Sequence, residues 1–264
     1  MNNTKITNSR LPLISLILLA FILSGVFLTV IYRASIEAVL SLPPHTQVQP
    51  VMPQLQKTAK APVAMSSVAT NMPTRLLAQD TFQRPNQQFW GQASDGQTWQ
   101  ADANNNPGFS IVEKMGQVSN GSGSFNATLG PMAANVEVVF TGSISAFPQS
   151  NMGSILRWND ASNWYKAYID GKNLIIIKKV GGITMLLKMV PFVAAARTAY
   201  TLRFRVIGTT LAAKAWLHGT PEPQMWMVQV TDTSLAQGFG GLRLLLGNGI
   251  VAAITSFQEF AISV

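Results

Sequence analysis

Residues 11–32 form an apolar run without a single charge. As a helix, a run of this length spans about 33 Å, and the hydrocarbon core of a bilayer is about 30 Å thick. Apolar side chains occur all round such a helix, which suits lipid better than the surface of a soluble domain. We therefore predict a transmembrane helix at 11–32 that contacts the lipid bilayer.

The charges that flank this run predict its orientation. Lys5, Arg10 and the amino terminus precede it, whereas Arg33 follows it and is balanced by Glu37. The more basic flank normally stays inside. We expect residues 1–10 to be cytoplasmic, the protein to be a single-pass protein of the cell membrane, and the remainder to be extracytoplasmic. A cleavable signal peptide is the alternative, but its apolar region is usually shorter, at about 7–15 residues.

The segment that follows has the composition of a spacer. Between residues 43 and 79 there are six prolines, no acidic residue and no apolar periodicity. Such a stretch buries too little apolar surface to offset the entropy of ordering the chain. We predict an uncleaved signal anchor at 11–32 and a Pro-rich linker or stalk at 33–79.

Residues 80–264 carry the pattern of an all-β domain. Residues 136–141 and 200–206 alternate apolar and polar side chains, and glycine turns such as Asp170-Gly171 separate short runs at 152–158, 164–170, 173–180 and 183–190. Short strands at this spacing are typical of sandwiches and barrels. We predict a two-sheet antiparallel sandwich of about a dozen strands, whose first and last strands, near Phe82 and near Phe257 or Phe260, pair.

Composition excludes several kinds of site. The chain has no cysteine and two histidines, of which only His218 lies in the predicted β domain. Thiol chemistry, cysteine-ligated metals and multi-histidine metal sites are therefore excluded, and a Ser-His-Asp triad has little support. The net charge of +8 divides into +5 for residues 1–79 and +3 for the rest. No basic stripe interleaved with aromatic residues occurs in the β domain, so we predict no nucleic-acid partner.

Several segments, taken in order, resemble the concanavalin A-like lectin and glucanase superfamily, which includes laminin G-like jelly rolls. They lie at residues 80–82, 153–160, 162–165, 168–171, 200–204, 238–243 and 257–260. The resemblance covers about 80–264 and implies a jelly-roll sandwich with one concave sheet that binds glycans or proteins. It also implies that a structural calcium ion is possible, with Asp80 and Glu259 as candidate ligands if the end strands pair. We predict no other cofactor.

The resemblance does not bring an enzymatic motif with it. Glycoside hydrolysis needs two carboxyl groups about 5–9.5 Å apart, whereas the glutamates of the β domain are isolated along the sequence. Asp95 with Asp102, and Asp160 with Asp170, are the remaining pairs, and turn chemistry accounts for them. We predict that the protein is not an enzyme, and keep a glycoside hydrolase that uses Asp160 and Asp170 as the weakest alternative.

A candidate binding face lies around the second strand of the meander. Trp164, Lys166 and Tyr168 share one face of that strand by alternation, and Arg157 is positioned to join them across the hairpin. Sugars stack on aromatic rings and hydrogen-bond to such polar groups. We therefore predict a ligand-binding patch of Arg157, Trp164, Lys166 and Tyr168 on the concave sheet. The alternative is that Arg157 stabilises a bend and Trp164 belongs to the core.

Two further tryptophans, Trp90 and Trp99, flank a polar loop. They form either a second platform at the rim or part of the sandwich edge. Together, these features predict a membrane-anchored, extracytoplasmic, non-catalytic module that binds carbohydrate. The alternative is a structural or adhesion protein of the cell envelope that binds protein partners.

Overall fold

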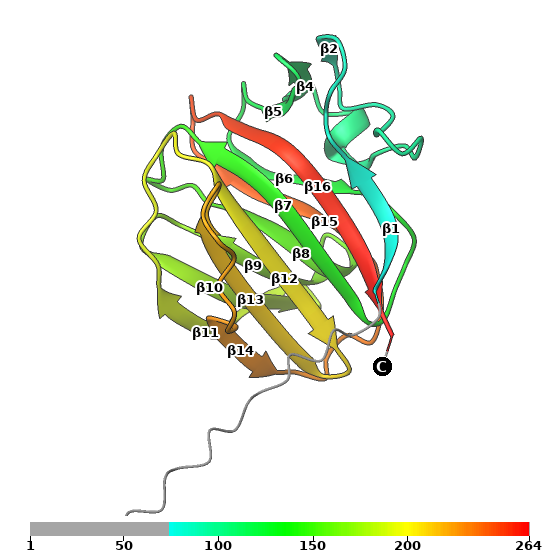
Figure 1. Ribbon diagram of the computed structural model, residues 1–264, viewed down its shortest axis with the longest axis vertical. Helices are drawn as coiled ribbons and strands as arrows, with labels where there is room; N and C mark the ends of the chain where they lie inside the picture. Colours follow the sequence, from blue (N-terminus) through cyan, green and yellow to red (C-terminus); the bar gives the residue numbers. More distant parts are fainter. Residues whose placement is uncertain (1–73, 264) are drawn as a thin grey trace, which may run out of the picture. The chain divides into compact units, whose positions relative to one another are not determined.

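The computed structural model describes residues 74–263, and these form a sandwich of two antiparallel sheets (Figure 1). Successive side chains of a strand point to opposite faces of its sheet, so each sheet has one face that packs inward against the other sheet. The prediction of an all-β two-sheet sandwich is confirmed. Among residues 74–263, no helix is long and apolar enough to cross a membrane. The predicted span at 11–32 and most of the predicted linker lie outside the described residues.

One sheet has nine strands, in the order β14-β13-β12-β7-β16-β5-β4-β2, with β1 paired to β16. Its long strands face the viewer in Figure 1, with the other sheet behind them. Its strands are β1 (Thr74–Asp80), β2 (Gln87–Gln88), β4 (Phe109–Val112), β5 (Met115–Val118), β7 (Val136–Ile144), β12 (Tyr200–Ile207), β13 (Thr210–Leu217), β14 (Val228–Thr231) and β16 (Ala252–Ile262).

The other sheet has seven strands, in the order β11-β10-β9-β8-β15-β6-β3. They are β3 (Gln100–Ala101), β6 (Gly123–Thr128), β8 (Met152–Asp160), β9 (Asn163–Ile169), β10 (Asn173–Val180), β11 (Ile183–Pro191) and β15 (Phe239–Leu246). Strands β8 to β11 are the predicted four-strand meander. A short 3-10 helix (Asp102–Asn104) follows β3.

Alternation along β9 divides its side chains between the core and the outside. Tyr165, Ala167 and Ile169 are buried in the core between the sheets. Trp164, Lys166 and Tyr168, which alternate with them, are therefore directed to the outer face of the seven-stranded sheet. This division was predicted from the sequence, and it positions the candidate site.

The first and last strands pair, as predicted. β1 runs antiparallel to β16, with Asp80 opposite Phe257. β1 already begins at Thr74, so residues 74–79, which the composition assigned to the linker, are part of the sandwich. Most side chains of this strand are exposed or half-buried, because backbone pairing with β16, rather than apolar alternation, places it in the sheet.

The loop between β1 and β4 is closed by an aromatic cluster. Trp90 and Trp99 are fully buried, with ring centroids 4.8 Å apart. They pack edge-on and stacked against Phe82, and Trp99 also contacts Phe257 at 5.0 Å. Of the two predicted roles for these tryptophans, packing in the sandwich edge is the one that the structure has.

Candidate functional site

Three of the four predicted site residues come together on the outer face of the seven-stranded sheet. Trp164, Lys166 and Tyr168 line a pocket of about 210 Å³, which we call the cationic pocket. The neighbouring strands complete it, and its full lining is Ser124, Asn151, Trp164, Lys166, Tyr168, Ile177, Lys179, Thr184, Arg243 and Leu245. The lining contains three cations and no carboxylate.

Lys166 is a buried cation with a single neutral partner. The residue is 3% exposed, its Nζ donates to Asn151 Oδ1 at 2.5 Å, and it lies 4.7 Å from the centroid of the Tyr168 ring. Burial, together with repulsion from Arg243, holds the pKa of Lys166 well below its usual range. An ammonium has three donors, so most of its hydrogen-bonding capacity remains open.

Arg243 is held in position by a relay of hydrogen bonds that runs through Asn126 to Asp102. Its guanidinium donates to Asn126 Oδ1 and, at 3.0 Å, to Ser124 Oγ. Asn126 in turn donates its backbone and side-chain N–H groups to Asp102 at 2.8 and 2.9 Å. Burial lowers the pKa of Arg243, and Asp102 opposes that effect. The relay fixes the position of the guanidinium without placing a carboxylate in the pocket.

Trp164 packs against Arg243 and does not offer an exposed ring for a sugar to stack on. It is 3% exposed, its Nε1 donates to the Ala161 carbonyl at 3.1 Å, and the Arg243 guanidinium lies 4.7 Å from its ring centroid. Tyr168 is only half-buried. The ring available for stacking is therefore that of Tyr168.

Arg157 does not join the other three residues. It has a positive φ of 49° in the irregular stretch of β8 after Leu156. Its guanidinium donates to the carbonyls of Ala134 at 3.0 and 2.7 Å, Leu235 at 2.5 Å and Gly208 at 2.7 Å. These bonds tie three loops together, so the bend-stabilising role, the alternative considered from the sequence, describes its contacts.

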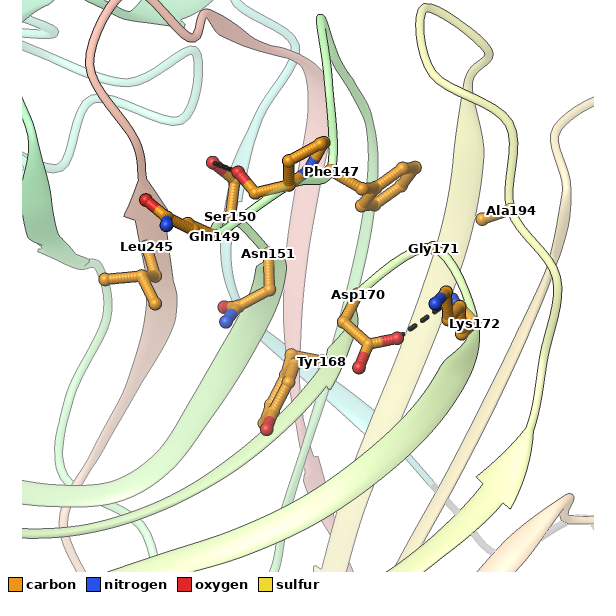
Figure 2. Close-up of a pocket in the computed structure, with 11 residues that line it drawn as sticks. Phe147, Gln149, Ser150, Asn151, Tyr168, Asp170, Gly171, Lys172, Ala194 and Leu245 are labelled. Atoms are coloured by element: carbon orange, nitrogen blue, oxygen red, sulfur yellow. Dashed lines mark hydrogen bonds between the residues drawn. The ribbon is translucent and has the colours of Figure 1, made fainter. Parts of the chain in front are cut away.

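A second, larger pocket adjoins the first. It has a volume of about 570 Å³ and shares Asn151, Tyr168 and Leu245 with the cationic pocket. We call it the loop pocket, because its remaining lining comes from two loops and the β9–β10 turn: Phe147, Pro148, Gln149, Ser150, Asp170, Gly171, Lys172 and Ala194. In Figure 2, Asn151 lies below the 147–150 loop, Asp170 lies to its right, and the Tyr168 ring lies below both. We refer to these two pockets, which share three lining residues, together as the groove.

The wall of the loop pocket is held by backbone and hydroxyl hydrogen bonds. Ser150 N donates to the Phe147 carbonyl at 2.8 Å, and Ser150 Oγ accepts from Gly247 N at 2.8 Å. Gln149 has a positive φ of 55°, a conformation that non-glycine residues seldom adopt. This loop is therefore a defined structural element that presents Asn151 to the groove.

Several groove residues were missed from the sequence, including Arg243 and Asn151. Arg243 lies in a segment that carried the family resemblance, and Asn151 precedes β8, but neither was assigned to the site. Leu242 pairs with Ser154 of β8 and with Ala127 of β6, which brings β15 beside the meander. Nothing in local sequence spacing gives this long-range register, because β15 is about 80 residues from its neighbour in the sheet.

The candidate catalytic aspartates are far apart. Asp160 and Asp170 lie at opposite ends of β9, and a strand of this length spans about 20 Å, more than twice the separation used by glycosidases. Asp160 accepts from Asn163 at 3.0 Å, and Asp170 accepts from the backbone of Lys172 at 2.9 Å. Both therefore stabilise turns.

The candidate calcium ligands do not fit a calcium ion. Asp80 accepts two hydrogen bonds from Arg84, at 2.7 and 2.9 Å, and one from Trp99 Nε1 at 2.7 Å. Glu259 is fully buried against Gly130 and Gly240, and burial raises its pKa to about 8. One carboxylate is already paired with a cation, and burial disfavours the charged form that the other would need in order to bind calcium. Within residues 74–263 no three acidic or histidine side chains cluster as metal ligands.

Comparison with known proteins gives structural matches only. No family model matches the sequence, and no curated protein does. A xylan β-1,4-xylosidase from Bacillus halodurans C-125 matches with a TM-score of 0.52 and 16% identity, over 69% of this chain and 38% of the enzyme. A GH43 protein from Bacillus licheniformis matches with a TM-score of 0.52 and 13% identity, over 69% and 39%. The carbohydrate-binding module CBM66 from Bacillus subtilis gives 0.47 and 13%, over 60% and 94%.

At these identities the likeness concerns the fold. The two enzymes above share the general fold of part of this chain. The chain spans less than two-fifths of the length of the two enzymes above. What this chain binds must therefore be argued from its own groove.

Proposed function

We propose that this protein is a non-catalytic, membrane-anchored, extracytoplasmic module that binds carbohydrate in the groove on the outer face of the seven-stranded sheet. The observation that carries the proposal is the pair of adjoining pockets with the half-buried ring of Tyr168 between them. A sugar stacks its C–H face on such a ring and directs its hydroxyl groups to amide and ammonium groups. Asn151, Lys166 and Lys172 supply those groups along the groove.

The arrangement of carboxyl groups supports a binding role rather than hydrolysis. Asp170 lines the loop pocket, but its oxygens accept hydrogen bonds from the amides of its own turn. The full-length protein should release no reducing sugar from a polysaccharide that it binds. Release that is abolished by Asp170→Asn would favour the hydrolase alternative instead.

The anchoring part of the proposal rests on the uncharged run at 11–32 and on the basic residues before it. A protease added outside intact cells should then cleave the β domain. If only lysed cells allow cleavage, the proposed orientation is wrong.

A paired substitution tests the binding face. Tyr168→Ala removes the ring from the groove, and we expect polysaccharide binding by the full-length protein to weaken about tenfold, or about 1.4 kcal/mol. Trp226→Ala, on the outer face of the other sheet, is the matched control and should leave binding unchanged. The opposite result would assign binding to the nine-stranded sheet.

The envelope-protein alternative is favoured by one feature, the edge strand β11. Ile183, Met185, Leu186 and Met189 are at least half exposed along it, and β11 is the last strand of its sheet. An exposed apolar edge is a template for pairing with another protein. Co-purification of a stoichiometric partner, lost in Ile183→Lys and insensitive to added sugar, would support this second function.

A further inference from the structure

The cationic pocket has a charge that the described chain does not balance. Lys166, Lys179 and Arg243 line it without any carboxylate, and among residues 74–263 none of the three forms an ion pair. We propose that this pocket is a subsite for an acidic sugar, whose carboxylate or sulfate group lies between Lys166 and Arg243. The inference rests on the proposed carbohydrate-binding function and adds the chemical class of the ligand.

Lys166 gives the inference its main support. Its ammonium is almost fully buried, yet its only hydrogen-bond partner in the described chain is the neutral side chain of Asn151. Burying a cation without a counterion is unfavourable, and the penalty is reduced only by an anion with good hydrogen-bonding geometry. An oxyanion in the pocket would accept from the two open donors of Lys166 and so relieve the cost of its burial.

Arg243 adds a second donor group that is already oriented. Its contacts with Asn126, Ser124 and the Trp164 ring hold the guanidinium at the pocket without neutralising it. A planar guanidinium suits carboxylate and sulfate oxygens better than it suits a neutral hydroxyl group. Because the Tyr168 ring adjoins Lys166, the pyranose ring that carries the anionic group is placed to stack on it.

Because burial of the Lys166 ammonium is unfavourable, a variant that lacks this charge should be more stable than the wild type. Lys166→Met keeps an unbranched side chain, one atom shorter than that of lysine, and removes its charge. Replacing a poorly partnered buried charge with an apolar side chain is often stabilising. We therefore expect Lys166→Met to raise the thermal unfolding midpoint of the protein while it abolishes the preference for acidic polymers. Loss of binding in a more stable protein is not explained by misfolding.

The experiment measures binding of the full-length protein to two matched pairs of immobilised polymers. The first pair is polygalacturonate and its fully methyl-esterified form. The second pair is chondroitin sulfate and its desulfated, carboxyl-methylated form. We expect at least one acidic polymer to bind about tenfold or more tightly than its uncharged partner, and a preference within the first pair would show that a carboxylate is sufficient.

The control is Lys188→Met, which removes an exposed lysine of β11 that does not line the groove. It should keep the preference that Lys166→Met loses. The inference is overturned if acidic and uncharged forms bind equally, if no polymer of either pair binds, or if the preference survives in Lys166→Met. Equal binding of both forms, weakened by Tyr168→Ala, would leave the proposed carbohydrate-binding function standing.

Discussion

The outer faces of the two sheets carry the same kinds of side chain in different electrostatic settings. On the nine-stranded sheet, Arg205 and Lys214 lie 4.8 and 5.0 Å from the ring centroid of Trp226. Arg205 pairs with Glu137 at 2.6 Å, and Lys214 pairs with Glu222 at 2.7 Å. Arg203 contacts both carboxylates, so every cation of this network is paired, and Glu137 and Glu222 are shared among them.

On the seven-stranded sheet, Lys166 and Arg243 also lie over aromatic rings, each at 4.7 Å. Here the nearest polar partners are the neutral groups of Asn151, Asn126 and Ser124. An aromatic ring with a cation is thus not by itself evidence of a site. The two faces differ in their carboxylates: the nine-stranded sheet pairs its own cations, whereas the pocket on the seven-stranded sheet leaves its cations open to an anionic ligand.

The greatest loss of stability should come from removing Glu137, the buried one of the two carboxylates on the nine-stranded sheet. Glu137→Gln leaves Arg203 and Arg205 without their buried partner, and we expect the free energy of unfolding to fall by about 3–5 kcal/mol. Glu222→Gln, whose side chain is 34% exposed, should cost less than about 1 kcal/mol. Urea unfolding of the full-length protein measures both. Equal losses would show that Glu137 is not what balances that face.

Arg157 provides a contrast with Lys166, because it is a buried cation whose guanidinium donates to three backbone carbonyls. Arg157→Met leaves three loop carbonyls without their donor, at about 1–3 kcal/mol for each unsatisfied group. We expect unfolding free energy to fall by about 3 kcal/mol, whereas Lys166→Met should not reduce it. If both variants lose stability to the same extent, Lys166 is a structural residue and the contrast between the two cations fails.

Glu259 is a carboxyl group that is fully buried, and no cation pairs with it among residues 74–263. Its pKa is raised to about 8 in the folded protein, against an ordinary value of 4.5. Between these values the unfolded chain has released a proton that the folded protein keeps, so stability falls as pH rises. Relative to Glu259→Gln, we expect the wild type to lose about 2 kcal/mol from pH 5 to pH 7. Parallel pH profiles from chemical unfolding would contradict this.

The smallest effect is on the pH dependence of ligand binding. As pH rises through the lowered pKa of Lys166, the ammonium loses its proton and an acidic polymer loses one partner. The other titratable groups that face Lys166 are Tyr168, whose pKa is raised mainly by burial, together with Lys179 and Arg243. We expect affinity to fall by up to about tenfold, and binding by Lys166→Met to show no such fall. An identical profile in both proteins would mean that another group titrates.

The sequence was informative where local alternation decides the structure. The period of two along β9 was enough to divide Tyr165 from Lys166, and the glycine turns were enough to predict the order of strands β8 to β11. The family resemblance, carried by generic strand and turn segments, agreed with the two-sheet fold.

Local alternation failed where geometry depends on distant parts of the chain. Arg157 was placed beside Lys166 by extending a regular hairpin, but the register shifts after Leu156 and the chain bends there. Arg243 reaches the site through a strand pairing that no local pattern encodes. Residues 74–79 of β1 were assigned to the linker because they form a strand through backbone pairing with β16, which their own sequence pattern does not indicate.

The most direct test of the account is hydrogen–deuterium exchange of the full-length protein with and without saturating polygalacturonate. A ligand in the groove should slow exchange in residues 147–151 and 170–172, which form its wall, and leave residues 212–226 on the opposite sheet unchanged. Slower exchange confined to residues 212–226 would contradict the proposal that the outer face of the seven-stranded sheet binds the glycan.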